Sequence, residues 1–194
     1  MVESKPLINP VRPDEWAYYL PLEGTSMFEF GGKQNPDLVK GREITYKSYF
    51  QALGYRHVSV DWDGRFGALV RDLRRPQWPK FGQFDMVCDI GTAEHVDGQK
   101  GFWENVHNLT KVGGLYVGQH PAPGGKNWYW HGTHYPTAEF YRQFATLNGW
   151  QIERIGYGRK PPRVNLYARM RRVKELPFIM PDESLIYWNR RRPR

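Results

Sequence analysis

Polar side chains follow four apolar stretches of this sequence, at the point where each stretch ends. Carboxylates can accept hydrogen bonds from the hydroxyls of a ligand, and a histidine can take up or release a proton near neutral pH. The third ending is the richest, because two acids, a threonine and a histidine fall within it. The four polar endings are Glu29–Asn35, Asp61–Gly64, Asp89–His95 and Gly118–Pro121.

The segments around these endings alternate between strand and helix patterns, which predicts a parallel α/β sheet covered by helices. A last strand-turn-strand predicts that one closing strand runs antiparallel. Ligands of an open α/β sheet bind beyond the carboxyl ends of its strands, so we expect the polar endings to meet at one edge. Strands are expected at 26–32, 57–64, 84–90, 115–121, 150–158 and 164–173, helices at 14–20, 43–54, 67–73, 98–113 and 137–150, and a loop at 121–136.

The charge of the chain is concentrated near its C-terminus. Its 194 residues carry a net charge of +8, and residues 154–194 hold twelve Lys and Arg against three Asp and Glu. We expect one domain over residues 1–175 and an extended basic C-terminal tail over 176–194. Residues 154–194 could bind nucleic acid through phosphate contacts, or could serve only to keep the protein soluble.

Cysteine content and hydropathy bear on the cellular compartment expected for the protein. The single cysteine, Cys88, excludes an internal disulfide, and its apolar neighbours predict a buried side chain. No apolar run approaches the ~20 residues that a membrane-spanning helix needs. The first residues lack the apolar centre of a signal peptide. A cytoplasmic protein with no membrane contact is therefore expected.

The glycines after the first strand do not form a phosphate-binding turn. Neither the G-x-G-x-x-G fingerprint nor the P-loop pattern occurs. Asp61, about thirty residues after Gly31, can still accept hydrogen bonds from both hydroxyls of a ribose. A nucleoside without phosphates is the better expectation, although Asp61 could instead cap a turn.

Several motifs in this order resemble class I S-adenosylmethionine-dependent methyltransferases, over about residues 25–173. They are Glu29-x-Gly31, Asp61, Asp72-Leu73, "FDMVCDIGTAEHV", "LTKVGGLYV" and "HGTHYP". The chain departs from the family where Lys33 and Asn35 replace two glycines of the first motif. The resemblance implies a Rossmann-like, mostly parallel sheet with helices on both faces, an antiparallel closing strand and S-adenosyl-L-methionine as cofactor. It implies cofactor contacts from Glu29, Gly31, Gly32, Asp61, Trp62, Asp72, Leu73, Asp89, Gly91 and Thr92.

Histidines on the loop after the fourth strand would border the substrate in this family. His120, His95 and His134 are the candidate catalytic bases, although His95 could simply pair with Glu94. Glu94, His131 and Tyr135 are candidate substrate contacts. Trp128–Trp130 could stack on a flat substrate or pack as a small core of the loop. No metal site is expected, because no carboxylate or cysteine accompanies the histidines within this loop.

The sequence thus predicts an S-adenosylmethionine-dependent methyltransferase acting on an oxygen or nitrogen of a small molecule or saccharide. Two alternatives stay open. One is a non-catalytic Rossmann-like binding module, and the other is a nucleic-acid methyltransferase that uses the basic segment. The sequence lacks the Asn/Asp-Pro-Pro-aromatic motif of amino-methylating DNA enzymes and the Pro-Cys of cytosine-C5 enzymes.

Overall fold

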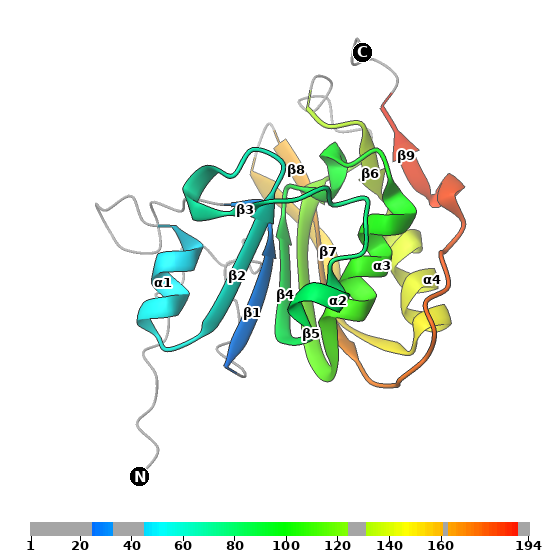
Figure 1. Ribbon diagram of the computed structural model, residues 1–194. Helices are drawn as coiled ribbons and strands as arrows, with labels where there is room; N and C mark the ends of the chain where they lie inside the picture. The colour runs from blue at the N-terminus through cyan, green and yellow to red at the C-terminus, as the bar shows by residue number, and fades with distance from the viewer. Residues whose placement is uncertain (1–24, 33–44, 124–130, 161–162, 190–194) are drawn as a thin grey trace.

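A seven-stranded sheet forms the centre of the protein (Figure 1). The computed structural model describes residues 25–32, 45–123, 131–160 and 163–189. The strands follow the order β3-β2-β1-β4-β5-β8-β7. All pairs from β3 to β5 are parallel, whereas β8 is antiparallel to both β5 and β7. Their bounds are β1 Ser26–Phe30, β2 Arg56–Asp61, β3 Leu69–Val70, β4 Phe84–Ile90, β5 Thr110–Pro121, β7 Trp150–Lys160 and β8 Arg163–Arg172. The predicted fold class is confirmed.

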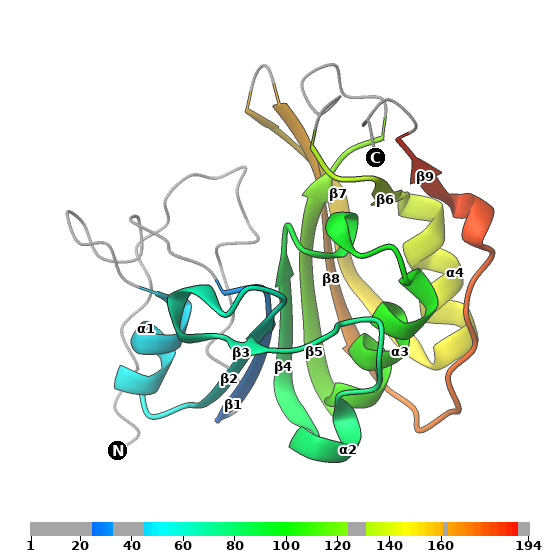
Figure 2. The same ribbon diagram turned by 45° about the horizontal axis from the view of Figure 1, so that its top comes forward.

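Helices lie on both faces of the sheet (Figure 2). Helix α1 (Tyr46–Ala52) packs Tyr46 and Phe50 into a cluster on one face, which also contains the fully buried Cys88. On the other face, α2 (Trp78–Phe81), α3 (Gln99–Leu109) and α4 (Ala138–Asn148) cover the larger core cluster. Thr137 caps α4 as predicted, since its hydroxyl accepts from the Phe140 N–H at 3.1 Å.

Several local predictions differ from the structure, and three of the differences have a clear cause. Residues 67–73, expected to be helical, contain the edge strand β3, because Leu69 and Val70 pair with Val60 and Asp61. Helix α3 ends at Leu109 rather than at 113, because Thr110 already pairs with Phe84 as the first residue of β5. The expected loop contains β6 (His134–Pro136), which pairs with β9 (Ile186–Trp188). The helix expected at 14–20 lies outside the described residues.

Residues 176–189 run along the domain surface and pack against it (Figure 1). The Asn148 side chain at the end of α4 accepts from the Ile179 N–H at 2.7 Å and donates to the Ile179 carbonyl at 2.9 Å. Phe178, Met180 and Leu185 pack against the large core cluster. This part of the expected tail is therefore extended but bound to the domain, through apolar and hydrogen-bonded contacts. It contains no Lys or Arg, since the basic residues of 176–194 all lie in 190–194.

Within the described residues, no helix combines the length and apolar character needed to cross a membrane.

Candidate functional site

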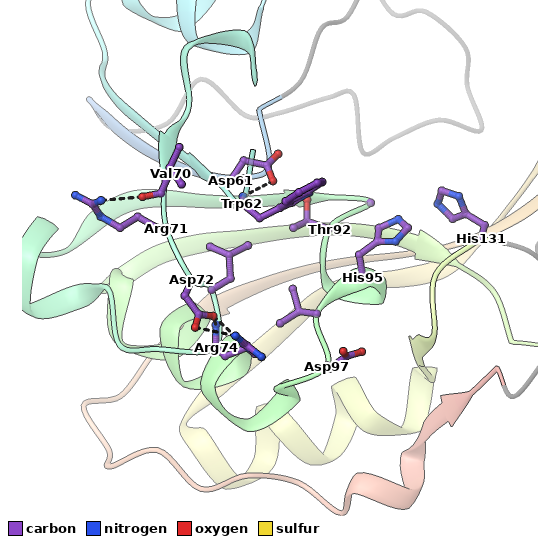
Figure 3. Close-up of a pocket in the computed structure, with 13 residues that line it drawn as sticks. Asp61, Trp62, Val70, Arg71, Asp72, Arg74, Thr92, His95, Asp97 and His131 are labelled. Carbon is purple, nitrogen blue, oxygen red and sulfur yellow. Dashed lines mark hydrogen bonds and ion pairs between the residues drawn. The ribbon is translucent and has the colours of Figure 1, made fainter. Parts of the chain in front are cut away.

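A pocket of about 820 Å³ lies at the carboxyl ends of the parallel strands (Figure 3). Its volume falls in the range of about 300–1,000 Å³ that small-molecule sites occupy. His95 and His131 lie next to each other at one end, and Arg71 and Asp72 lie toward the other (Figure 3). The lining residues are Asp61, Trp62, Val70, Arg71, Asp72, Leu73, Arg74, Gly91, Thr92, His95, Val96, Asp97 and His131.

Asp61 ends β2 and ties this strand to the glycines after β1. Its Oδ2 accepts from the Gly32 N–H at 3.1 Å, and its Oδ1 accepts from the Trp62 N–H at 2.7 Å. A Cβ at Gly32 would stand only 2.5 Å from the Arg65 carbonyl oxygen, so the close approach of these two turns requires glycine. Asp61 is thereby held at the pocket with its carboxylate only partly enclosed.

The strand β3 and the turn after it form the second part of this wall. Asp72 forms an ion pair with Arg74 at 2.8 Å and with Arg75 at 3.4 Å. The hydrogen bond from Arg74 is the main reason that the pKa of Asp72 falls to about 2. Leu73 adds an apolar surface beneath it, and the indole of Trp62 is 78% exposed. This wall therefore offers carboxylates, an apolar patch and an accessible aromatic ring to one ligand.

The opposite wall is supported by acids and a histidine that are completely enclosed. The side chain of His120 lies between two carboxylates, with Nδ1 3.2 Å from Glu94 Oε2 and Nε2 3.3 Å from Asp89 Oδ2. Asp89 Oδ1 accepts from the N–H groups of Thr92 and Ala93, at 3.1 and 3.2 Å. The network therefore fixes the turn after β4 that carries Gly91 and Thr92 into the pocket.

Two tyrosines extend this buried network into the core. The Tyr116 hydroxyl lies 3.4 Å from Asp89 Oδ2, 3.3 Å from His120 Nε2 and 3.4 Å from the Tyr141 hydroxyl. Burial raises the pKa of both tyrosines well above the usual value. They act here as neutral hydrogen-bonding groups. Sequence reasoning missed them, because a tyrosine in an apolar strand or helix carries no signal that separates it from ordinary core.

The two buried acids have opposite protonation tendencies. Burial raises the pKa of Asp89 from 3.8 to about 6, against the attraction of His120. Burial also opposes ionisation of Glu94, but the imidazoles of His120 and His131 outweigh it and hold the pKa of Glu94 well below its usual range. Near neutral pH, Glu94 is thus the firmly ionised member of the network.

The loop residues expected to meet a substrate divide into two groups. His131 lines the pocket, and its Nε2 lies 3.3 Å from Glu94 Oε1. Tyr135 is buried and donates its hydroxyl hydrogen to the His131 carbonyl, so it supports this residue from behind. His134 does not line the pocket, and its Nδ1 lies 2.8 Å from the Thr133 hydroxyl and 3.9 Å from Asp97. Trp128–Trp130 lie outside the described residues.

Eight of the sixteen predicted site residues line the pocket, and eight lie behind or beside it. The lining residues are Asp61, Trp62, Asp72, Leu73, Gly91, Thr92, His95 and His131.

The other predicted residues lie behind or beside the pocket. Gly31 and Gly32 adjoin Asp61 at the end of β1. Glu29 is buried in β1 with its Oε2 3.5 Å from His57 Nε2 of β2. Asp89, Glu94 and His120 form the enclosed network, and none of them lines the pocket. Sequence reasoning missed Val70, Arg71, Arg74, Val96 and Asp97, the first two of which belong to the segment interpreted as helical.

The basic region is partly neutralised where the structure describes it. Arg169 and Arg171 of β8 each form an ion pair of 2.6 Å with Glu153 of β7. Arg172 is 1% exposed and donates to the carbonyls of His107 and Thr110. These arginines stabilise the sheet edge. Residues 190–194, which include four arginines, lie outside the described residues.

The fold is that of known methyltransferases. No protein-family model matches the sequence, and no curated protein is detectably similar to it. One similar solved structure is the 1,6-didemethyltoxoflavin-N1-methyltransferase of Burkholderia thailandensis with bound 1,6-didemethyltoxoflavin and S-adenosylhomocysteine. It is 14% identical, with a TM-score of 0.54 over 77% of this chain and 71% of that one.

Two further solved structures of methyltransferases are similar to this chain. One is a methyltransferase of Listeria monocytogenes described as dependent on S-adenosylmethionine. It is 10% identical, with a TM-score of 0.56 over 75% of this chain and 89% of that one. The other is the geranyl diphosphate C-methyltransferase of Streptomyces coelicolor in complex with Mg²⁺, geranyl diphosphate and S-adenosyl-L-homocysteine. It is 12% identical, with a TM-score of 0.53 over 77% of this chain and 74% of that one. At these identities the similarity establishes the class I methyltransferase fold.

Proposed function

We propose that this protein is an S-adenosylmethionine-dependent methyltransferase that methylates an oxygen or nitrogen of a small molecule. The observation that carries the proposal is the pocket itself. It joins the acid that ends β2, the turn after β4 and a pair of histidines at the one edge where this fold binds ligands. The bound S-adenosylhomocysteine of two structural neighbours supports the choice of cofactor.

The cofactor would lie along the wall formed by β2 and β3. Asp61 would accept hydrogen bonds from the ribose hydroxyls. The adenine would rest near Asp72 and Leu73, with the exposed ring of Trp62 able to stack on it. The methionine part would lie beside Gly91 and Thr92, where Thr92 is anchored by donating its hydroxyl hydrogen to the Phe30 carbonyl at 2.9 Å. The residues assigned to the cofactor in this arrangement all line the pocket, whereas Phe30 lies behind Thr92.

The acceptor would lie at the histidine end of the pocket. Bound S-adenosylmethionine would supply the methyl group. A lone pair of the acceptor oxygen or nitrogen would form the new bond to the methyl carbon, and the electrons of the broken carbon–sulfur bond would stay on the sulfur of a neutral thioether. In the metal-free pocket, His95 or His131 can take the proton that the acceptor loses. The small-molecule substrates of the neighbours support this class of acceptor, to which a saccharide also belongs.

Calorimetry with S-adenosylhomocysteine tests the proposal. The wild-type protein should bind it, and Asp61→Ala should weaken binding by about 1.5–3 kcal/mol, the range for a lost hydrogen bond to a charged group. Asp63→Ala is the matched control, since Asp63 belongs to the same turn but does not line the pocket.

Two outcomes would contradict the proposal. One is a folded wild-type protein that does not bind S-adenosylhomocysteine. The other is an Asp61→Ala variant that binds it as well as wild type, which would remove the ribose assignment. Binding without any methyl transfer to a panel of hydroxyl and amine acceptors would favour a non-catalytic binding module.

A further inference from the structure

Three metal-ligating side chains from two distant segments meet at the histidine end of the pocket. Glu94 and His95 lie on the short helical turn after β4, and His131 comes from the loop before β6. One ligand atom from each lies within 4.8 Å of the other two. No metal site is expected from the sequence, because the loop itself lacks a carboxylate. Glu94, which lies outside the loop, supplies one, whereas His120 and His134 lie elsewhere.

We infer that Glu94, His95 and His131 form a binding site for a divalent transition-metal ion such as Zn²⁺ or Mn²⁺. Two imidazoles and one carboxylate are a ligand set that such ions accept in proteins. The site is separate from the predicted cofactor contacts of Asp61 and Asp72.

The distances are close to those of a formed site. Metal–ligand bonds of about 2.0–2.2 Å in a tetrahedral site place two ligand atoms about 3.4 Å apart. Glu94 Oε1 and His131 Nε2 are already 3.3 Å apart, and His95 Nε2 lies 3.9 Å from the same oxygen. The histidine side chains are 39% and 43% exposed, so small rotations can complete the geometry.

The loop that carries His131 is clamped onto Glu94. The Thr133 N–H donates to the Glu94 carbonyl at 2.7 Å. Gly132 has a φ of 47°, and a Cβ there would stand only 2.7 Å from Glu94 Cγ. Glycine is thus required for this close approach, which brings His131 over the carboxylate. Tyr135 also holds the His131 carbonyl through its hydroxyl.

The carboxylate is oriented from behind by the buried network. Glu94 Oε2 lies 3.2 Å from His120, whose other ring nitrogen lies 3.3 Å from Asp89. Oε1 is thereby directed toward His95 and His131. Outer-shell partners of this kind orient a metal ligand and raise its affinity for the ion.

Three protein ligands leave coordination positions open, as in catalytic rather than structural metal sites. His95 and His131 line the pocket, so the open positions would face a bound molecule. A polar oxygen or nitrogen of the acceptor could occupy one of them. This last role rests on the proposed function, whereas the metal site itself does not.

Calorimetry with ZnCl₂ and with MnCl₂, on metal-stripped protein without cofactor, tests the inference. We expect one ion of at least one of these metals per chain. Replacing both exposed ligands, His95→Ala with His131→Ala, should weaken binding by more than the ~10–100-fold that loss of an outer-shell partner costs. Glu94→Gln should weaken it comparably. The matched control is His134→Ala, which should bind as wild type.

The outcomes separate the two proposals. Unchanged affinity in the double histidine variant, confirmed as folded by circular dichroism, would overturn the metal site, as would the failure of the wild-type protein to bind either ion. Because the replaced histidines are exposed, this variant stays informative even where Glu94→Gln does not fold. S-adenosylhomocysteine binding is measured separately, so its failure would contradict the proposed function and leave the metal site standing.

Discussion

The two walls of the pocket contain similar residue types in opposite environments. On the β2–β3 wall, Asp61 and Asp72 are partly exposed and pair with backbone N–H groups or with exposed arginines. On the β4–β5 wall, Asp89 and Glu94 are fully buried and lie on either side of His120. The same type of group therefore lines an open pocket on one wall and belongs to a buried network on the other.

Position relative to the sheet explains the difference. Asp61 is the last residue of an outer parallel strand, next to the two-residue edge strand β3, so water reaches its carboxylate. Asp89 lies in β4, the middle strand of the seven-stranded sheet, beneath α3 and α4. Glu94 follows it on a turn that the segment 131–133 covers. The number of packed layers around each acid decides whether water reaches its carboxylate or a network of buried groups encloses it.

The largest expected effect comes from Glu94. Glu94→Ala removes the partner of a buried histidine, and breaking a buried pair costs about 3–5 kcal/mol of unfolding free energy. Urea denaturation followed by circular dichroism measures this difference. A loss below about 1 kcal/mol, as for an exposed pair, would erase the contrast between the two walls.

The pH dependence of stability should change with Asp89. Its native pKa is raised from 3.8 to about 6, so the native state holds this proton more tightly than the unfolded chain. The resulting stabilisation is complete below the unfolded value and is lost as the pH rises through about 6.

Asp89→Asn cannot titrate at this position. The difference in unfolding free energy between this variant and wild type should therefore shift in favour of the variant by about 2 kcal/mol from pH 4.5 to pH 7.5. The size follows from about 1.4 kcal/mol per unit of pKa shift. Urea denaturation of both proteins at the two pH values measures the change. A constant difference between them would mean that Asp89 does not carry the raised pKa.

The smallest effect on stability is expected on the exposed wall. Asp72→Ala breaks an exposed ion pair, and its unfolding free energy should change by less than about 1 kcal/mol. Affinity for S-adenosylhomocysteine should nevertheless fall by about 1 kcal/mol, roughly fivefold, if the carboxylate meets the adenine. Urea denaturation and calorimetry on the same variant measure both quantities. A large loss of stability with unchanged affinity would reverse the roles assigned to the two walls.

Much of the architecture could be predicted because its signals are local. The apolar run over residues 84–90 and the capped, amphipathic pattern over 137–150 predict their elements without reference to the rest of the chain. The segment 67–73 could not be predicted in this way, because a two-residue edge strand forms only through its pairing with β2. The packing of residues 176–189 also depends on a surface made by α4.

Half of the candidate site residues line the pocket, and the others show where sequence reasoning ends. The polar endings of the strands were expected at one edge, since parallel strands end together. Whether Asp89 and His120 reach the pocket depends on which face of the sheet each side chain occupies and on what covers it. No spacing in the sequence contains that information.

The sequence by itself determined the succession of strands and helices, and the chemical groups available at the ends of the strands. Hydrophobic period and capping act over a few residues and can be read directly from the chain. Only the tertiary structure decided that Glu94 lies between His120 and His131, 26 residues ahead of the first. The reason is physical: the low-dielectric enclosure that shifts the protonation of these groups, and the close approach at Gly132, exist only after distant segments have packed together.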